Sequence, residues 1–303
     1  MSVSVAGLTK RFDDQIAVNE LSFEARPGEI LGFLGPNGAG KTTTMKMICG
    51  YMPPDEGTAV VEGYDVNESP LQARRKIGYL PEHNPLYDEM YIREFLRFVA
   101  SIHKIEDKDT RIEEVITMTG LEKEKNKVIG TLSKGYRQRV GLAQAIIHDP
   151  AVLILDEPTS GLDMNQLIDI RQLIRDLGKE KTVIFSSHIM QEVQALCDRV
   201  VIINNGALVA DEPIGRLTAR MGQGQTIHLE VERAGVSDAV FSSIPGVDHV
   251  TREGNIYVIS STGGQDIRKP VFEAAVKSGL VILEMKLDRA NVEEVFRKLT
   301  KSN

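Results

Sequence analysis

The sequence lacks several features that would point to a particular class of protein. It has only two cysteines, Cys49 and Cys197, far apart and each within an apolar stretch, so we expect buried reduced thiols rather than a disulfide or a metal site. No group of cysteines and histidines has the spacing of a zinc site. The net charge of −7 and the isoelectric point near 5.5 argue against a general nucleic-acid binder, because such a protein carries a basic face.

Long apolar runs are absent as well. No uncharged stretch is long enough to span a bilayer, and the N-terminus has no basic segment followed by an apolar core, as a secretory signal would have. We therefore expect an intracellular protein that meets a membrane only peripherally. The 303 residues, 42% hydrophobic and 26% charged, suffice for one large domain with a smaller one, or for two domains.

A glycine-rich stretch at residues 35–42 reads Gly-Pro-Asn-Gly-Ala-Gly-Lys-Thr and matches the pattern of a phosphate-binding loop. Residues 29–34 before it predict a buried strand, and residues 43–49 after it predict a helix. In that setting backbone N–H groups and the helix N-terminus point at phosphate oxygens. Lys41 is expected to reach the β- and γ-phosphates, and Thr42 to hold Mg²⁺. The residues expected to contact nucleotide here are Gly35, Pro36, Asn37, Gly38, Ala39, Gly40, Lys41, Thr42 and Thr43.

Two adjacent carboxylates, Asp156 and Glu157, follow the apolar run at residues 152–155. In an ATPase with a phosphate-binding loop, the first carboxylate holds Mg²⁺ through water at the end of a strand. The second is placed to act as general base toward the attacking water. A solvated turn is the alternative for such a pair taken alone.

Patterning divides the chain into two domains. Residues 3–6, 19–24 and 58–61 predict a small antiparallel sheet, and helical faces follow at 92–99, at 112–119 and after Ser133. Apolar runs at 152–155, 183–185 and 200–203 alternate with helical stretches and predict a parallel sheet, which Asn205-Gly206 continues as a hairpin. Residues 213–224 read as a boundary. Beyond it, strands at 226–231, 256–259 and 280–283 and helices at 236–244, 267–278 and 291–300 predict a small α+β domain. The expected domains are residues 1–218 and 219–303.

A third motif, Leu-Ser-Lys-Gly-Tyr-Arg-Gln at residues 132–138, offers a second anion site. Ser133 is expected to cap a helix, and Gly135 to let a phosphate approach the helix end. With this motif in place, residues 1 to about 215 resemble the nucleotide-binding domain of an ABC transporter. The resemblance implies an α/β P-loop NTPase fold with a parallel core sheet, an antiparallel β-subdomain and a helical subdomain, and it implies ATP and Mg²⁺ as ligands.

The resemblance also assigns roles to isolated residues. Phe12 matches the aromatic residue that stacks on adenine, although a core aromatic at a strand end is the alternative. Asp163, in Ser-Gly-Leu-Asp, matches the acidic member of the loop that couples two nucleotide sites. His188 matches the histidine that contacts the γ-phosphate and orients the catalytic water; Glu157, His188 and Lys41 are thus the expected catalytic residues.

The sequence departs from the family pattern in two places. Glu82 stands where the family often has glutamine, and its carboxylate is expected to coordinate Mg²⁺ or hold water while adding negative charge beside ATP. Lys134 and Tyr136 stand where glycine and glutamine are common. Because Ser133 and Gly135 remain, we expect activity to survive.

The two phosphate-binding motifs of one chain point in different directions, so two copies related by a two-fold axis are expected to enclose two ATP molecules. Each ATP would lie between residues 35–42 of one chain and residues 133–135 of the other. Separate permease subunits would supply the transport pathway and hold the ATPase at the inner face of the membrane. Residues 82–91 are expected to dock on them through Leu86, Tyr87, Met90 and Tyr91.

The whole chain is similar to the ATPases of ABC-2-type exporters, and residues 291–300 are similar to the usual end of their appended domain. Residues 78–87 are similar to the gliding-motility-associated subunit of bacteria. A multidrug or polysaccharide exporter is the main alternative. A soluble ABC ATPase is disfavoured because those of translation usually hold two cassettes. Residues 219–303 are expected either to stabilise the dimer or tune its opening, or only to pack.

Overall fold

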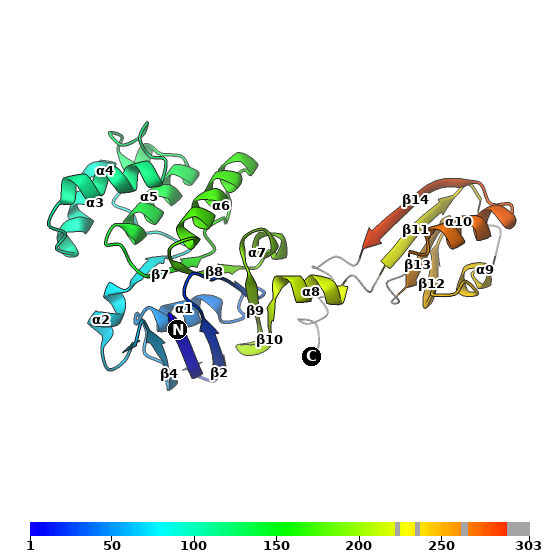
Figure 1. The fold of residues 1–303 in the computed structure, drawn as a ribbon, viewed down its shortest axis with the longest axis horizontal. Coiled ribbons are helices and arrows are strands. Elements are labelled where there is room, and N and C mark those ends of the chain that lie inside the picture. Colours follow the sequence, from blue (N-terminus) through cyan, green and yellow to red (C-terminus); the bar gives the residue numbers. More distant parts are fainter. Residues whose placement is uncertain (222–224, 234–236, 262–265, 290–303) are drawn as a thin grey trace. The chain divides into compact units, whose positions relative to one another are not determined.

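The structure is a computed structural model that describes residues 1–221, 225–233, 237–261 and 266–289 (Figure 1). The chain divides into two compact units, Met1–Glu212 and Pro213–Asn303. The boundary expected at residue 218 lies inside helix α8 (Ile214–Met221), which the sequence analysis did not predict. Ile214 and Leu217 have helical spacing, and a single glycine between them does not prevent a short helix.

The first unit begins with an antiparallel sheet. Strands β1 (Val3–Phe12), β2 (Gln15–Ala25), β4 (Glu56–Val61) and β5 (Tyr64–Asp65) lie in the order β2-β1-β4-β5. All their pairings are antiparallel, as predicted. The ring centroid of Phe23 in β2 lies 5.2 Å from that of Phe33 in strand β3 (Ile30–Leu34), and this contact joins the antiparallel sheet to the core.

A six-stranded sheet forms the centre of the unit in the order β10-β9-β3-β8-β7-β6. The strands from β9 to β6 pair in parallel, as the uninterrupted apolar runs predicted. Asn205 and Gly206, with φ of 48° and 78°, form the predicted hairpin turn into β10. The strands are β3 (Ile30–Leu34), β6 (Ile77–Leu80), β7 (Val152–Asp156), β8 (Thr182–Ser187), β9 (Arg199–Asn204) and β10 (Ala207–Pro213).

Helices surround this sheet, and Figure 1 shows α3, α4 and α5 gathered at one end of the unit, away from β1, β2 and β4. The predicted inner face of α3, with Ile92, Phe95, Leu96 and Val99, is buried. The helices are α1 (Lys41–Ile48), α2 (Pro70–Arg75), α3 (Ile92–Ile102), α4 (Lys108–Met118), the 3₁₀ turn Ile129–Thr131, α5 (Lys134–Ile146), α6 (Met164–Gly178) and α7 (Met190–Leu196).

The cysteines and the helix lengths agree with the sequence. Cys49 and Cys197 are free and buried, and burial raises the pKa of both thiols. Among the helices of the described residues, none combines the length and the apolar character that crossing a membrane requires.

The second unit contains β11 (Gln225–Val231), α9 (Ala239–Ser242), β12 (His249–Glu253), β13 (Ile256–Ser261), α10 (Arg268–Lys277) and β14 (Ile282–Arg289) after α8. The antiparallel order β12-β13-β11-β14 makes this a βαββαβ arrangement. Strand β12 was not predicted because it is polar, and β14 begins later and ends later than expected. The helix predicted at 291–300 lies outside the described residues.

Candidate functional site

Three of the predicted functional elements meet at one edge of the central sheet. Strands β3, β8 and β7 are neighbours and run parallel, with Leu34 opposite Ser187 and Ser186 opposite Asp156. Because parallel strands end at the same edge, the glycine-rich loop, the Asp156-Glu157 pair and His188 emerge side by side. Chain order alone does not imply this, since β8 follows β7 in the sequence but lies between β3 and β7.

Close approaches of the backbone explain the glycines of the phosphate-binding loop. Gly40 has a φ of 99°, and a Cβ there would lie 2.4 Å from the carbonyl oxygen of Ala17. A Cβ on Gly35 would lie 2.7 Å from the carbonyl oxygen of Ile203. The loop is therefore held between two other segments, and α1 begins directly after it at Lys41.

Replacing Gly40 by alanine should lower the free energy of unfolding more than the same change at Gly38. Both residues have positive φ, but a Cβ on Gly38 meets nothing within 4 Å. Gly38→Ala is therefore expected to lose about 1–2 kcal/mol from backbone strain alone. Gly40→Ala must in addition displace the Ala17 carbonyl. Urea unfolding of both variants without nucleotide measures the difference, and equal losses would contradict the packing argument.

The side chains of Lys41, Glu157 and His188 form a chain of contacts across the site. Lys41 Nζ donates to the carbonyl oxygens of Gly35 at 2.8 Å and Pro36 at 3.3 Å. It also lies 3.4 Å from Glu157 Oε1. On the other side, His188 Nδ1 lies 2.9 Å from Glu157 Oε2. Glu157 is thus held between the lysine and the histidine, and its φ of 48° is the kind of backbone strain that persists at functional sites.

Ser186 positions both carboxylates, a role that the sequence did not reveal. Its hydroxyl donates to Asp156 Oδ1 at 2.6 Å and accepts from the Glu157 backbone N–H at 3.0 Å. The sequence places Ser186 near the end of a predicted strand. It does not show that this strand, β8, lies beside β7, and only that strand order brings Ser186 next to Asp156. Asp156 Oδ2 is buried and makes no hydrogen bond within the described part of the chain. Such an oxygen fits a site for a hard cation.

A cavity of about 620 Å³ opens over Lys41, Glu157 and His188, within the range of about 300–1,000 Å³ typical of small-molecule sites. Phe12, 43% exposed, and Glu82 belong to its wall. Gln15, Ala17 and Ser160 also line it, and the sequence analysis did not name them as nucleotide contacts. The cavity is lined by Phe12, Gln15, Ala17, Asn37, Gly38, Gly40, Lys41, Thr42, Thr43, Glu82, Glu157, Ser160 and His188.

The motif of the second anion site lies apart from this cavity, since Ser133, Gly135 and Asp163 are not among its lining residues. Ser133 occupies the N-cap position of α5, as predicted, but its side chain makes no capping hydrogen bond, and the residue is exposed. A Cβ on Gly135 would lie 2.6 Å from Gln166 Cδ, so the Gln166 side chain packs directly on this glycine and would have to move for a larger residue. Asp163 caps α6 by accepting from the Gln166 backbone N–H at 2.9 Å.

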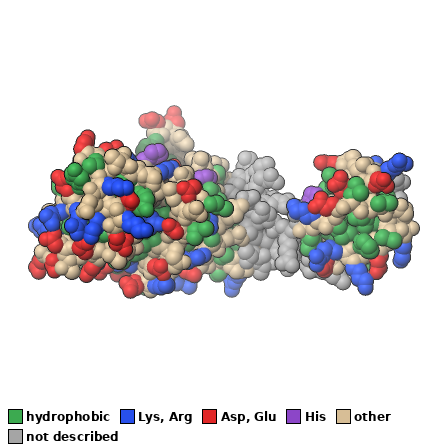
Figure 2. Space-filling model, turned by 90° about the horizontal axis from the view of Figure 1, so that it is seen from above, with side chains coloured by type: hydrophobic (Ala, Val, Ile, Leu, Met, Phe, Trp, Pro, Cys, Tyr) green, Lys and Arg blue, Asp and Glu red, His purple; other side chains and the backbone are tan. Residues whose placement is uncertain are grey.

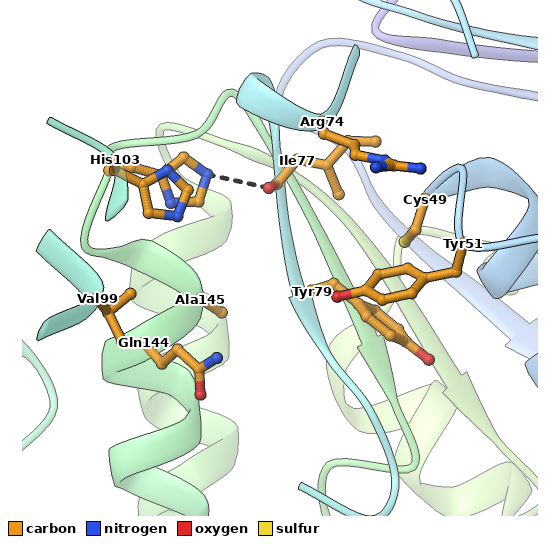
Figure 3. Close-up of a pocket in the computed structure, with 10 residues that line it drawn as sticks. Cys49, Tyr51, Arg74, Ile77, Tyr79, Val99, His103, Gln144 and Ala145 are labelled. Atoms are coloured by element: carbon orange, nitrogen blue, oxygen red, sulfur yellow. Dashed lines mark hydrogen bonds between the residues drawn. The ribbon is translucent and has the colours of Figure 1, made fainter. Parts of the chain in front are cut away.

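A second cavity of about 340 Å³ lies between β6 and helices α3 and α5. Figure 3 shows Tyr51 and Tyr79 on one side of it and His103 on the other. The His148 ring stacks on the His103 ring, with their centroids 4.0 Å apart. Its Nε2 donates to the carbonyl oxygen of Ile77 at 3.0 Å. Burial lowers the pKa of His148 to about 4, so this ring is neutral at pH 7. No residue predicted to bind ATP or Mg²⁺ is among the described residues lining this cavity.

Comparison with known proteins agrees with this geometry. The family profile described as ABC transporter matches residues 18–160. The bacitracin transport ATP-binding protein BcrA of Bacillus licheniformis is 35% identical, and the match covers 98% of this chain and 96% of the relative. This chain belongs to the ABC transporter family. It is an ABC transporter ATPase, which binds and hydrolyses ATP.

Two further matches bear on the rest of this ABC ATPase. The Nod factor export ATP-binding protein I of Rhizobium sp. (strain N33) is 33% identical, with 99% of this chain and 97% of the relative covered. The dimeric structure of a bacterial ABC transporter cassette matches with a TM-score of 0.64 and 25% identity, over 70% of this chain and 98% of that one. The expected fold, an ABC nucleotide-binding domain with an added C-terminal unit, is confirmed.

Proposed function

We propose that this ATPase is the energy-supplying subunit of an ABC-2-type exporter and hydrolyses ATP with Glu157 as general base. The observation that supports this best is the chain of contacts from Lys41 through Glu157 to His188 in the wall of one cavity. A carboxylate between a lysine and a histidine is positioned at two oxygens at once, so its orientation toward a water is restricted.

Each cavity residue has a distinct role in this proposal. Lys41 neutralises the β- and γ-phosphates, and the backbone N–H groups of residues 35–43 hold their oxygens. His188 orients Glu157 and contacts the γ-phosphate. Phe12, which lines the cavity and is 43% exposed, stacks on adenine.

We assign Mg²⁺ to Thr42, Asp156 and Glu82. Thr42 and Glu82 line the cavity, and the unpartnered Asp156 Oδ2 supplies the kind of oxygen that this ion prefers. When bound, Mg²⁺ neutralises charge on the β- and γ-phosphates. Glu82 places a carboxylate where the family often has an amide. We therefore expect Mg²⁺ to bind more tightly, while the same carboxylate adds negative charge beside ATP.

Two copies close around two ATP molecules in this proposal, and Ser133, Gly135 and Asp163 of each copy complete the site of the other. Their separation from the cavity of their own chain supports this division. The exposed Ser133 hydroxyl and the uncapped α5 N-terminus remain available to a γ-phosphate. The matching cassette structure is itself a dimer. The partner would be a second copy or a homologue.

Permease subunits would provide the pathway and anchor the ATPase at the inner face of the membrane. The names of the relatives, a bacitracin transport protein and a Nod factor export protein, favour export. Residues 82–91 offer exposed aromatic side chains, with Tyr87 53% and Tyr91 52% exposed. The ring centroid of Tyr87 lies 6.0 Å from that of Phe95 and 5.9 Å from that of Phe98. Both phenylalanines belong to helix α3, which therefore holds the Tyr87 ring in place.

The double variant Tyr87→Ala/Glu89→Lys tests the docking surface. It should lose most of its association with the permease, because an aromatic anchor is removed and a surface charge is reversed. Co-purification from detergent-solubilised membranes measures the association and also identifies the partner. Tyr64→Ala/Glu68→Lys, on the antiparallel-sheet side, is the matched control. Unchanged association of the Tyr87 variant, with ATP binding intact in both, would reject this surface.

The cargo class is the finer part of the proposal. Residues 78–87 favour a gliding-motility or secretion-related system, whereas the relatives' names favour export of small molecules. A multidrug or polysaccharide exporter is therefore the second candidate, and the co-purified permease distinguishes the two. We expect no nucleic-acid partner, given the net charge of −7.

A further inference from the structure

Glu82 lies between two cavities of the first unit. It lines the cavity over Lys41, which we call the nucleotide cavity, and also a separate cavity of about 310 Å³ between residues 82–86 and the start of helix α5. No other described residue belongs to the linings of both. The Glu82 side chain is exposed, and its carboxylate forms no hydrogen bond or ion pair with another described residue. It can therefore turn toward either cavity.

Lys134 supplies an available positive charge in the smaller cavity. The cavity is also lined by Arg137, but that guanidinium already lies 2.8 Å from Asp88 Oδ1. Lys134 is exposed and forms no hydrogen bond or ion pair with a described residue. A Cβ on Gly161 would collide with Lys134 Nζ, and the preceding residue, Ser160, lines the nucleotide cavity. The Lys134 ammonium therefore lies near the boundary between the two cavities.

The charges of Glu82 and Lys134 are both additions to the family pattern, which often has glutamine and glycine at these positions. The two additions have opposite signs and line the same cavity. Figure 2 shows Lys and Arg side chains interspersed with Asp and Glu over the visible face of the first unit. Distant charges of mixed sign largely cancel and are screened by salt, so the nearest charges dominate at the Glu82 carboxylate.

We propose that Glu82 has two alternative partners within one chain, Lys134 when the nucleotide cavity is empty and Mg²⁺ when Mg-ATP fills it. The inference rests on the proposed role of Glu82 as a Mg²⁺ ligand, and it adds Lys134 as a positioning residue. A lysine has a flexible stem and a strongly hydrated ammonium, so its pair with an exposed carboxylate is weak. A divalent cation attracts the same carboxylate more strongly.

The exchange would link the two phosphate-binding regions of one chain. Lys134 directly follows Ser133, which the proposed function assigns to the ATP of the second copy. When Glu82 turns to Mg²⁺, the Lys134 ammonium becomes available beside that phosphate. Filling a chain's own cavity would therefore strengthen its hold on the ATP of the second copy, and such coupling between sites is reciprocal.

Zero-length cross-linking of the full chain tests the pairing directly. A water-soluble carbodiimide joins a carboxylate to an amine that contacts it, and mass spectrometry of peptides identifies the joined residues. We expect a Glu82–Lys134 link without nucleotide and a several-fold lower yield with saturating Mg-ATP. The link between Lys125 and Glu113, whose charged atoms lie 3.0 Å apart, is the internal control and should not change. Absence of the Glu82–Lys134 link, or a yield that Mg-ATP leaves unchanged, would overturn the proposal.

A magnesium titration measures the competition between the two partners. The readout is the binding of a fluorescent, non-hydrolysable ATP analogue to protein dilute enough to stay monomeric. Lys134→Met should lower the Mg²⁺ concentration at half-saturation by about two- to fivefold, the effect of losing a partly exposed ion pair. Lys134→Arg, which keeps the charge, and Lys123→Met, an exposed lysine after α4, should behave as the unmodified protein. In the Glu82→Gln background, Lys134→Met should have no further effect.

The outcomes separate this inference from the proposed function. No shift in Lys134→Met, or a shift of the same size in the Glu82→Gln background, would overturn the exchange and leave the Mg²⁺ role of Glu82 standing. An unchanged magnesium dependence in Glu82→Gln alone would instead reject Glu82 as a Mg²⁺ ligand, and the exchange with it.

Discussion

Glu157→Gln is expected to lower the rate of ATP hydrolysis by about 10²–10⁴-fold, the usual contribution of a positioned general base. Glutamine preserves the size of the side chain, and it can still meet Lys41 and His188, which lie 3.4 Å and 2.9 Å from the two carboxylate oxygens. It cannot accept a proton from water. ATP binding should therefore persist while hydrolysis stops, and steady-state phosphate release measures the loss.

The same variant should accumulate as a dimer with Mg-ATP, because hydrolysis normally reopens the interface. Removal of one negative charge beside the triphosphate also favours the bound state. Sedimentation with saturating Mg-ATP, with membrane subunits present, measures the dimer. Glu180→Gln, an exposed carboxylate after α6, is the control and should behave as the unmodified protein. A Glu157→Gln protein that stays monomeric would reject the two-chain site.

Ser133→Arg is expected to abolish ATP hydrolysis, by at least about 10²-fold, and to leave ATP binding to the monomer unchanged. The serine is exposed and makes no capping bond at α5, so its replacement should not disturb the fold. Its position outside the Lys41 cavity separates it from nucleotide bound to its own chain. The arginine would obstruct the phosphate of ATP bound to the second copy.

Two measurements check the Ser133 prediction. Titration with a fluorescent ATP analogue at low protein concentration reports monomer binding, and phosphate release at high concentration reports hydrolysis. Ser101→Arg, an exposed position on α3, is the matched control for the added side chain. Loss of nucleotide binding by the Ser133→Arg monomer would contradict the division of the site between two chains.

The sequence by itself determined the parts of the ATPase whose chemistry lies in consecutive residues. The loop at 35–42 needs only its own glycines, the strand before it and the helix after it, so its position was predictable, although α1 begins at Lys41, two residues before the predicted start. The apolar runs of β7 and β8 were likewise predictable, because strands buried on both faces lose all polar alternation. The same reasoning failed for β12, since a polar edge strand has no buried face to reveal it.

Only the tertiary structure decided which of these parts meet. Strand β8 lies between β3 and β7, and this order brings Lys41, Glu157 and His188 together and places Ser186 beside Asp156. It also gave Gly135 a packing role against Gln166. Strand order depends on which long-range pairings bury the most apolar surface, and local sequence patterns carry no information about that choice.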